Sequence, residues 1–317
     1  MKILVTGGAG FIGSHLVRRL VRERVGSVAV LDNFHRGTVA NLADCLGEIR
    51  LLRTDVRNSA AMRGALRGID LVYHLAAQSS VLGSEADSDY TFQTNVLGTF
   101  DLLRAARTNG VRRVVFTSSR EVYGDPLQLP VPETAPLRPK NLYGASKVAG
   151  EAYCSVFRSE GLETAVLRLA NVYGQGDTDR VIPLFVERAS QGWPLVLYGG
   201  QQVMDFVWID TVVEALWKVG FGDPIMETLN VASGKGVTIA NLSQRVLELT
   251  GWRSTVKIDP ARQTEVTRFV ADVIRSRQVL GLDQPADPLF GLPEMVDWTS
   301  KQRAMSHAGS PLAPITS

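Results

Sequence analysis

Tyr143 and Lys147 carry the side chains in this chain that are best suited to proton chemistry. They stand four residues apart in Asn-Leu-Tyr-Gly-Ala-Ser-Lys, a spacing that places both on one face of a helix. A phenol with a pKa of about 10 is a poor base at neutral pH, but a neighbouring ammonium group favours the phenolate. The pair therefore predicts a general base that takes a proton from an alcohol as hydride leaves the same carbon.

A hydroxyl side chain precedes this pair at the end of a β-prone run. Residues 112–118 have the pattern of a strand, and Ser119 follows at the carboxyl end, where ligands bind in parallel sheets. The Ser119 hydroxyl is placed to hydrogen-bond the substrate oxygen and to stabilise charge as a ketone forms. Tyr-x-x-x-Lys also occurs by chance on helix surfaces, and a surface pair is the alternative. The position after the strand favours catalysis.

The elements that must hold such a site begin at the N-terminus. An apolar run at residues 3–5 leads into glycines at positions 7, 8, 10 and 13 and then into a helical pattern. Gly8, Gly10 and Gly13 match the dinucleotide fingerprint, and Gly7 with the last two matches its wider variant. Such glycines permit a tight turn, the close approach of a pyrophosphate and close helix–strand packing, and the helix N-terminus receives the phosphates.

An acidic residue at the end of the next predicted strand identifies the dinucleotide. Asp32 follows the strand that begins at Ser27 and stands nineteen residues after Gly13. A carboxylate there accepts hydrogen bonds from both ribose hydroxyls and repels a 2′-phosphate. The cofactor predicted is therefore NAD, although Arg36 nearby leaves NADP as an alternative.

Charge, cysteine content and hydropathy exclude several classes of protein. A net charge of +2 over 317 residues argues against nucleic acid or an anionic membrane as the main partner. Cys45 and Cys154, both in expected helices, are too few for a disulfide framework or a metal site. The chain starts directly with a strand, and no apolar run is long enough to span a bilayer. We therefore expect a cytoplasmic protein without a metal.

Strand and helix patterns alternate through the first half of the chain. This alternation predicts an α/β fold with a Rossmann-type doubly wound parallel sheet and a smaller C-terminal α/β lobe that binds the substrate. We assign residues 1–170 and about 206–235 to the NAD-binding domain, 171–205 and 236–300 to the substrate lobe, and 306–317 to a flexible tail. The expected strands are 2–6, 27–32, 49–53, 70–75, 112–118 and 163–169, and the expected helices are 12–24, 58–67, 90–109 and 143–160.

A series of short motifs extends the glycine-rich turn and the Tyr/Lys pair along the chain. They are Thr6 to Ser14, Leu31 to Asn33, Asp55-Val56, His74 to Ala77, Thr117 to Ser119, Val122 to Gly124, Tyr143 to Lys147, Arg168 to Gly174 and Asp205 to Asp210. In this order they resemble the extended short-chain dehydrogenase/reductase superfamily, in its NAD-dependent nucleotide-sugar epimerase and dehydratase branch, with UDP-glucose 4-epimerase as the nearest broad type. The resemblance covers Met1 to about Trp298.

The resemblance implies roles that spacing alone does not give. It implies a nucleotide-diphosphate sugar as substrate, with UDP as the first choice, and a homodimer in which helices 90–109 and 143–160 form a four-helix bundle with their mates. The cofactor residues it implies are Gly7, Gly10, Phe11, Ile12, Gly13, Asp32, Asn33, Asp55, Val56, Leu75, Ala76, Ala77, Asn95, Thr117, Tyr143, Lys147 and Leu169. The substrate residues are Val81, Ser119, Arg120, Glu121, Asn171, Arg180, Arg262 and Glu265.

The chain departs from this pattern at two places. Members of the family usually carry an arginine that contacts the diphosphate where this chain has Met204, and a thioether donates no hydrogen bond. Arg180, Arg262 and Arg268 are candidates to replace it. The second place is Arg120-Glu121, where 4-epimerases generally have small or hydroxylic residues, dehydratases have Asp-Glu and glucuronate decarboxylases have Ser-Glu.

The second departure leaves the reaction open. Glu121 is a reasonable base for a C5 proton once a 4-ketone has acidified it, whereas Arg120 is a poor proton donor to a leaving hydroxyl. Arg120 could pair with Glu121, bind a substrate carboxylate or point to solvent. With the dehydratase acid missing, we favour a 4-epimerase in which NAD is regenerated in each cycle. A 4,6- or 5,6-dehydratase or a uronate decarboxylase that uses Glu121 comes second, and a non-catalytic NAD-binding module is a remote alternative.

Overall fold

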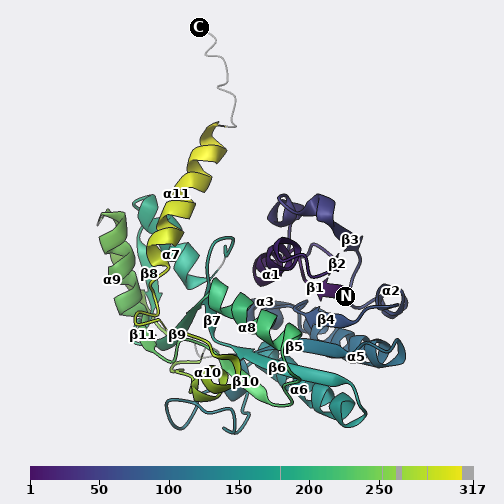
Figure 1. Cartoon of the computed structure of the whole chain (residues 1–317). Helices are drawn as coiled ribbons and strands as arrows, with labels where there is room; N and C mark the ends of the chain where they lie inside the picture. Colours follow the sequence, from purple (N-terminus) through teal and green to yellow (C-terminus); the bar gives the residue numbers. More distant parts are fainter. Residues whose placement is uncertain (179, 252, 262–265, 284, 309–317) are drawn as a thin grey trace.

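A seven-stranded parallel sheet forms the centre of the fold (Figure 1). The computed structural model describes residues 1–178, 180–251, 253–261, 266–283 and 285–308. The strand order is β10-β6-β5-β4-β1-β2-β3, which confirms the predicted Rossmann-type sheet. The strands are β1 (Lys2–Thr6), β2 (Ser27–Asp32), β3 (Ile49–Arg53), β4 (Leu71–His74), β5 (Arg113–Ser119), β6 (Glu163–Leu169) and β10 (Thr228–Val231).

The order of the strands reverses between β1 and β4, which are neighbours in the sheet. From β1 the chain proceeds outward to β2 and β3, and it then returns to β4 on the other side of β1. The loops that follow β1 and β4 therefore leave the sheet in opposite directions and open a crevice at its carboxyl edge. The glycine-rich turn follows β1, and Ser119 ends β5 beside β4, so the topology brings both to this edge.

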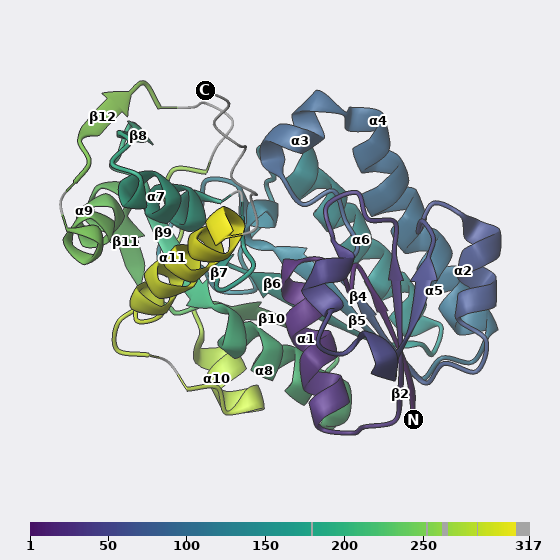
Figure 2. The ribbon, with the colours of Figure 1, turned by 90° about the horizontal axis from the view of Figure 1, so that it is seen from above.

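Helices cover both faces of the sheet because its strands alternate their side chains between two apolar cores. Ile3 and Val5 of β1 belong to the core with α1 and α8, whereas Leu4 belongs to the core with α2, α5 and α6. Figure 2 shows α1 on the opposite side of the strands from α2 and α5. These helices are α1 (Phe11–Arg22), α2 (Ser59–Ala65), α5 (Gly98–Thr108), α6 (Leu142–Ser159) and α8 (Ile209–Phe221).

Two smaller sheets lie in the second half of the chain. We assigned residues 206–235, approximately, to the NAD-binding domain. Within this range β10 joins the main sheet, but residues 206–208 belong to β9 in a three-stranded sheet. Asp205 explains this difference, because its buried carboxylate accepts the backbone N–H groups of Ser233, Gly234 and Ala271 and so holds β9 against these loops. The elements are β7 (Asn171–Tyr173), β9 (Val203–Trp208), β11 (Gly236–Thr238), β8 (Leu195–Tyr198), β12 (Val256–Asp259), α7 (Val181–Ser190), α9 (Ile239–Thr250), α10 (Ile274–Leu280) and α11 (Leu292–Ala308).

The helix expected over residues 90–109 consists of three successive segments. They are α4 (Ser88–Thr91), the π-helical η3 (Phe92–Leu97) and α5. Asn95 in the π-helical turn donates to the backbone oxygen of Gln78 and to Ser146 of α6. The wider turn therefore coincides with the point where a buried amide joins this helix to the loop after β4 and to α6.

The structure also differs from the sequence-based expectations in several short segments. Cys45 lies between the 3-10 helices η1 (Val39–Leu42) and η2 (Leu46–Glu48), not in a helix, because a 3-10 turn seldom continues beyond a few residues. The helix α11 includes the first three residues of the predicted tail, and residues 309–317 of that tail lie outside the described residues. The short helices α3 (Val81–Ala86) and η4 (Arg120–Tyr123) were not expected.

Within the part of the chain that the structure describes, the helices lack the combination of length and apolar character that crossing a membrane requires. Cys45 and Cys154 are both buried and free.

Candidate functional site

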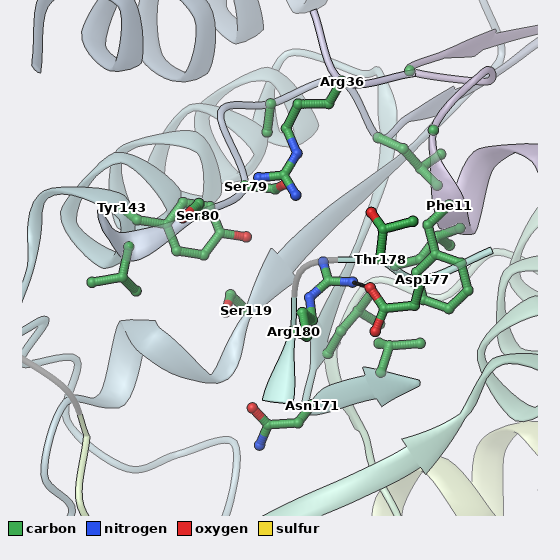
Figure 3. Close-up of a pocket in the computed structure, with 18 of the residues that line it drawn as sticks. Phe11, Arg36, Ser79, Ser80, Ser119, Tyr143, Asn171, Asp177, Thr178 and Arg180 are labelled. Carbon is green, nitrogen blue, oxygen red and sulfur yellow. Dashed lines mark hydrogen bonds and ion pairs between the residues drawn. The ribbon is translucent and has the colours of Figure 1, made fainter. Parts of the chain in front are cut away.

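A cavity of about 790 Å³ lies at the carboxyl edge of the main sheet, and its walls come from both halves of the chain (Figure 3). Gly7, Ser119 and Tyr143 line it from the sheet and its helices, and Asn171 and Arg180 line it from the second half. Its volume is within the range of small-molecule and cofactor sites, about 300–1,000 Å³. The topological switch point therefore coincides with a cavity large enough for a sizeable ligand.

The glycine-rich turn is shaped by close backbone contacts. Gly7 has a φ of +70°, and a Cβ on it would lie 2.7 Å from the backbone N of Ala76 in the loop after β4. A Cβ on Gly13 would lie 2.2 Å from the carbonyl oxygen of Gly7. Gly10, the N-cap of α1, contributes no side-chain cap, so the N–H groups of the first helical turn remain available to an anion.

Asp32 stands at the end of β2 on the wall of the same cavity. One carboxylate oxygen accepts the N–H of Ala9 at 2.9 Å, and the other accepts the N–H of Phe34 at 2.8 Å. Burial raises the pKa of Asp32, and the two backbone hydrogen bonds oppose that rise. The carboxylate is thus fixed in position and retains lone pairs that ribose hydroxyls could use.

The cavity fits NAD on two further grounds. The hydroxyl of Thr94 lines it, is buried and has no partner among the described residues, so a bound ligand could supply one. A side chain at position 7 would not fit beside Ala76. Because Gly7 has none, a pyrophosphate can approach the backbone of the turn. Gly10, Phe11, Ile12, Asn33, Val56, Leu75, Ala77, Thr117 and Leu169, all predicted cofactor residues, line the cavity as well.

Tyr143 and Ser119 meet in the cavity from different elements. Tyr143 lies in the first turn of α6, whose N-cap Asn141 accepts the N–H of Gly144 at 2.8 Å, and Ser119 ends β5. Both side chains line the cavity, and Figure 3 shows Ser119 and Arg180 below the Tyr143 ring. Burial raises the pKa of Tyr143, whereas the charge of Arg180 and the Ser119 hydroxyl lower it. Two hydroxyl groups thus lie in the same part of the cavity, where they could hold a single substrate oxygen.

Lys147 lies one turn further along α6, and its ammonium group is 5.8 Å from the centre of the Tyr143 ring. It donates to the backbone oxygen of Thr117 at 2.8 Å and is 4% exposed. Burial lowers its pKa from 10.5 to about 8, so the ammonium form persists at neutral pH. The buried positive charge could stabilise a phenolate on Tyr143, at a cost to the stability of the fold.

Substitution of Lys147 by methionine is therefore expected to change two properties: the dependence of the free energy of unfolding on pH, and the rate of turnover. A lysine whose pKa is lower in the folded state loses its proton there first, so folding becomes more favourable as the pH rises from about 8 towards 10.5. Between about pH 7 and about pH 10 the wild type should gain roughly 2–3 kcal/mol from this group, and Lys147→Met should lack that gain. Denaturant unfolding of both proteins without dinucleotide measures it. Turnover should fall by about 10²-fold or more. An equal gain in the variant would refute this account.

Arg120 and Glu121 form a buried ion pair next to Ser119. Arg120 Nη2 lies 2.8 Å from Glu121 Oε1, and Arg120 Nε donates to Asn171 Oδ1 at 3.2 Å. The second oxygen of Glu121 accepts the amide of Asn141 at 2.7 Å. Of the three possibilities for Arg120, the structure therefore has the pair with Glu121. Arg120 Nη1 is buried and lacks an acceptor among the described residues.

The wall expected to face the substrate diphosphate is largely apolar. Met204 is 8% exposed and lines the cavity, as do Leu197 and Phe206. Arg180 lines it too and bonds Asp177 at 2.9 Å, whereas Arg268 is exposed and is not a lining residue. Arg180 is thus the candidate that the geometry favours as a phosphate contact. Arg262 and Glu265 lie outside the described residues.

The structure brings together most of the predicted site residues, Val81 and Ala76 included. Asp55 and Asn95 are the described exceptions, because they do not line the cavity. Asp55 binds Arg57 and Asn33, and Asn95 braces the loop after β4. The lining residues that sequence reasoning missed include His35, Tyr90, Thr94 and Gln202. Tyr90 and Thr94 lie in the predicted helix 90–109, close in sequence to the predicted cofactor residue Asn95. That closeness was the only sequence signal that could have indicated them.

A Rossmann-type sheet with a tyrosine, a lysine and a serine at one cavity defines an NAD-binding enzyme of the short-chain dehydrogenase/reductase type. The chain belongs to the NAD dependent epimerase/dehydratase family, whose model matches residues 3–232. It is thus an NAD-dependent enzyme of the nucleotide-sugar epimerase/dehydratase type.

Similar proteins carry out more than one reaction. A putative UDP-glucose 4-epimerase of Methanocaldococcus jannaschii is 33% identical over 93% of this chain and 97% of its own length. UDP-glucuronic acid decarboxylase 5 of Arabidopsis thaliana is 32% identical over 93% of this chain and 88% of its own. The crystal structure of dTDP-glucose 4,6-dehydratase DesIV from Streptomyces venezuelae, with NAD bound, is 34% identical, has a TM-score of 0.91 and covers 96% of this chain and 98% of its own. These comparisons establish the family and leave the reaction undecided.

Proposed function

We propose that the protein is a 4-epimerase of nucleotide-diphosphate sugars and that UDP-sugars are its first candidates as substrates. The observation that carries the proposal is that both carboxylate oxygens of Glu121 are engaged by neighbouring side chains. One of its carboxylate oxygens is paired with Arg120, and the other accepts the amide of Asn141. A carboxylate whose two oxygens already accept hydrogen bonds is a poor base for a C5 proton. The neighbouring Arg120 is a poor acid for a leaving group at C6, because a guanidinium keeps its proton. Epimerisation at C4 needs neither.

The residues that would act in this reaction are those around Tyr143. When bound, NAD supplies a reversible acceptor for the hydride of the sugar C4. Ser119 would hold the C4 oxygen, and Tyr143 would take its proton as the ketone forms. The guanidinium of Arg180 lowers the pKa of Tyr143 against the effect of burial, and the ammonium of Lys147, 5.8 Å from the centre of the ring, would also favour the phenolate that accepts this proton. After the 4-keto sugar has rotated, so that the opposite face of C4 receives the hydride back, Tyr143 would return the proton to the C4 oxygen.

Incubation with UDP-, dTDP- and GDP-sugars, including UDP-glucuronic acid, without added NAD tests the proposal. An epimerase gives a product of unchanged mass with inverted configuration at C4, as read by mass spectrometry and NMR. Loss of water would instead identify a dehydratase, and loss of carbon dioxide a decarboxylase. Either of these two results would refute the 4-epimerase.

The variant Glu121→Gln sharpens this test. Its amide can still accept from Arg120 or Asn141, but it cannot remove a C5 proton. We expect an epimerase to keep turnover within about tenfold of the wild type, whereas an enzyme that uses Glu121 as a base should lose about 10²-fold or more. A thermal unfolding curve for the variant shows whether it folds. Loss of turnover in a folded variant would move the assignment to C5 chemistry.

A substrate with a carboxylate at C6 is the second candidate. Arg120 Nη1 is buried beside the cavity without an acceptor among the described residues, and an unsatisfied guanidinium nitrogen suits a carboxylate. The similarity to a UDP-glucuronic acid decarboxylase supports including uronic acids in the panel. Preference for UDP-glucuronic acid over UDP-glucose, with that preference lost in Arg120→Ala, would establish this substrate class.

A homodimer remains part of the proposal. Phe92 and Leu97 of η3 are 54% and 47% exposed, and Val156 of α6 is 53% exposed. Apolar side chains so exposed on neighbouring helices are typical of an interface. Light scattering of the purified protein measures the mass, and a monomer at micromolar concentration would contradict the dimer.

A further inference from the structure

Three side chains from separate segments gather beside the part of the cavity that contains Asp32. His35 follows β2, Arg57 follows β3 and Tyr90 lies in α4. The rings of His35 and Tyr90 have centroids 4.6 Å apart and are inclined by 33°. The Cζ atom of Arg57 lies 4.5 Å from the centre of the Tyr90 ring. The aromatic ring of Tyr90 thus contacts the loops after two strands, by aromatic stacking with His35 and by a cation–π contact with Arg57.

Hydrogen bonds through Asn33 and Asp55 also connect Tyr90 to Arg57. The Asn33 amide donates to the Tyr90 hydroxyl at 3.1 Å and to an Asp55 oxygen at 2.7 Å. Asp55 in turn accepts from Arg57 Nε at 3.0 Å and from its Nη2 at 2.9 Å. Burial raises the pKa of Asp55, but the hydrogen bonds from Arg57 and Asn33 outweigh this effect and lower it, so Asp55 remains a carboxylate at neutral pH. Asp55 therefore fixes Arg57, and Arg57 together with Asn33 fixes Tyr90.

This group of residues faces the adenosine half of the dinucleotide site. Asn33, His35 and Tyr90 line the cavity together with Val56 and with Asp32, the residue suited to the ribose. The loop after β2 also sends Arg36 into the cavity (Figure 3). The contacts of Tyr90 thus connect the loops after β2 and β3 to α4 across the edge of this half. These contacts therefore form part of the wall around this half of the cavity.

We propose that His35, Tyr90 and Arg57 form a strap across the adenosine half of bound NAD and set the rate at which the dinucleotide leaves. The reason is physical. The strap consists of weak contacts among partly exposed side chains, so it can open, yet its members are coupled and open together. An enzyme whose cofactor returns to its starting state gains from slow release. The inference needs only NAD as the ligand and is independent of the reaction at C4.

The test replaces the aromatic ring at position 90 and measures release of the dinucleotide. In Tyr90→Ala the contacts with His35 and Arg57 are both lost, and we expect NADH, followed by its fluorescence during displacement by excess NAD, to leave about 10–100-fold faster. Tyr90→Phe keeps the ring and loses only the bond from Asn33, so its release should accelerate by about threefold or less. Arg57→Gln, which keeps the tyrosine, should fall between the two.

Two controls make the result specific. Trp193→Ala removes an exposed aromatic ring, 52% exposed, that does not line the cavity, and it should leave release unchanged. The affinity for ADP-ribose, which lacks the nicotinamide, should weaken in Tyr90→Ala by a factor similar to that for NAD. Wild-type release from a folded Tyr90→Ala protein would overturn the strap. Equal acceleration in Tyr90→Phe would overturn it too, because the effect would then belong to the hydroxyl group. If Tyr90→Ala fails to fold, unchanged release from Arg57→Gln overturns it.

Discussion

Tyr143→Phe is expected to lower the turnover of a nucleotide sugar by about 10²–10⁴-fold, the range that general acid–base catalysis contributes. The variant loses the hydroxyl whose pKa the Ser119 side chain helps to lower, but keeps the half-buried ring. The bound NAD content, measured after denaturation, should match that of the wild type. Because burial raises the pKa of Tyr143, the wild-type rate should fall as the pH is lowered, since the phenol then holds its proton.

Tyr153→Phe is the matched control for this result. Tyr153 lies on the same helix, α6, but its ring packs against Phe100 at a centroid distance of 5.1 Å and does not line the cavity. Loss of its hydroxyl should leave turnover within about twofold of the wild type, as for other substitutions away from special features. Full turnover in Tyr143→Phe would assign the proton to another acceptor, and the proposed mechanism would fail.

Gly13→Ala is expected to damage the fold and the cofactor site together. The new methyl group would lie 2.2 Å from the Gly7 carbonyl oxygen and 2.7 Å from the Gly8 Cα. Both neighbours are backbone atoms, so the turn itself must shift, and we expect a loss of about 3 kcal/mol in the free energy of unfolding. The protein should also be purified with little or no NAD. Denaturant unfolding and the ratio of dinucleotide to protein measure the two effects.

Gly10→Ala is expected to weaken NAD binding with little loss of stability, and so it separates the effect on the fold from the effect on the cofactor site. A Cβ on Gly10 would meet only the Gly7 carbonyl oxygen, at 3.2 Å, and Gly10 has an ordinary φ of −77°. Its stability should change by about 1 kcal/mol or less. Its affinity for NAD should still fall by about tenfold, because the methyl group would stand where the pyrophosphate approaches the helix N-terminus. Wild-type affinity in Gly10→Ala would place the phosphates elsewhere.

The sequence predicted the central sheet well because its signals are local. The strand expected at residues 27–32 has those bounds in β2, and the strand at 163–169 has them in β6. Short apolar runs separated by helical periodicity are sufficient for this, since alternation of the two implies parallel pairing. The sequence did not indicate the π-helical turn at Asn95, because that turn is associated with hydrogen bonds to Gln78 and Ser146 from other elements.

Within the site, residues fixed by spacing were predicted better than residues that meet through folding. Tyr143 and Lys147 are four apart on one helix, and their proximity follows from helix geometry. The contact of Tyr90 with His35 joins segments fifty-five residues apart, and no periodicity encodes it. The pairing of Arg120 with Glu121 depended on the turn at the end of β5, and the sequence left three possibilities for that arginine.

The sequence by itself determined the class of fold, the glycine turn, the acidic residue at the end of the second strand and the Tyr/Lys pair, because each depends on residues close together along the chain. Tertiary structure alone decided that Glu121 is engaged by Arg120 and Asn141, that β9 joins the smaller sheet and that Met204 lies on the cavity wall. These outcomes depend on how loops from distant segments dock. How the loops dock depends on the balance between burial and hydrogen bonding across the whole molecule. A local sequence pattern does not contain that information.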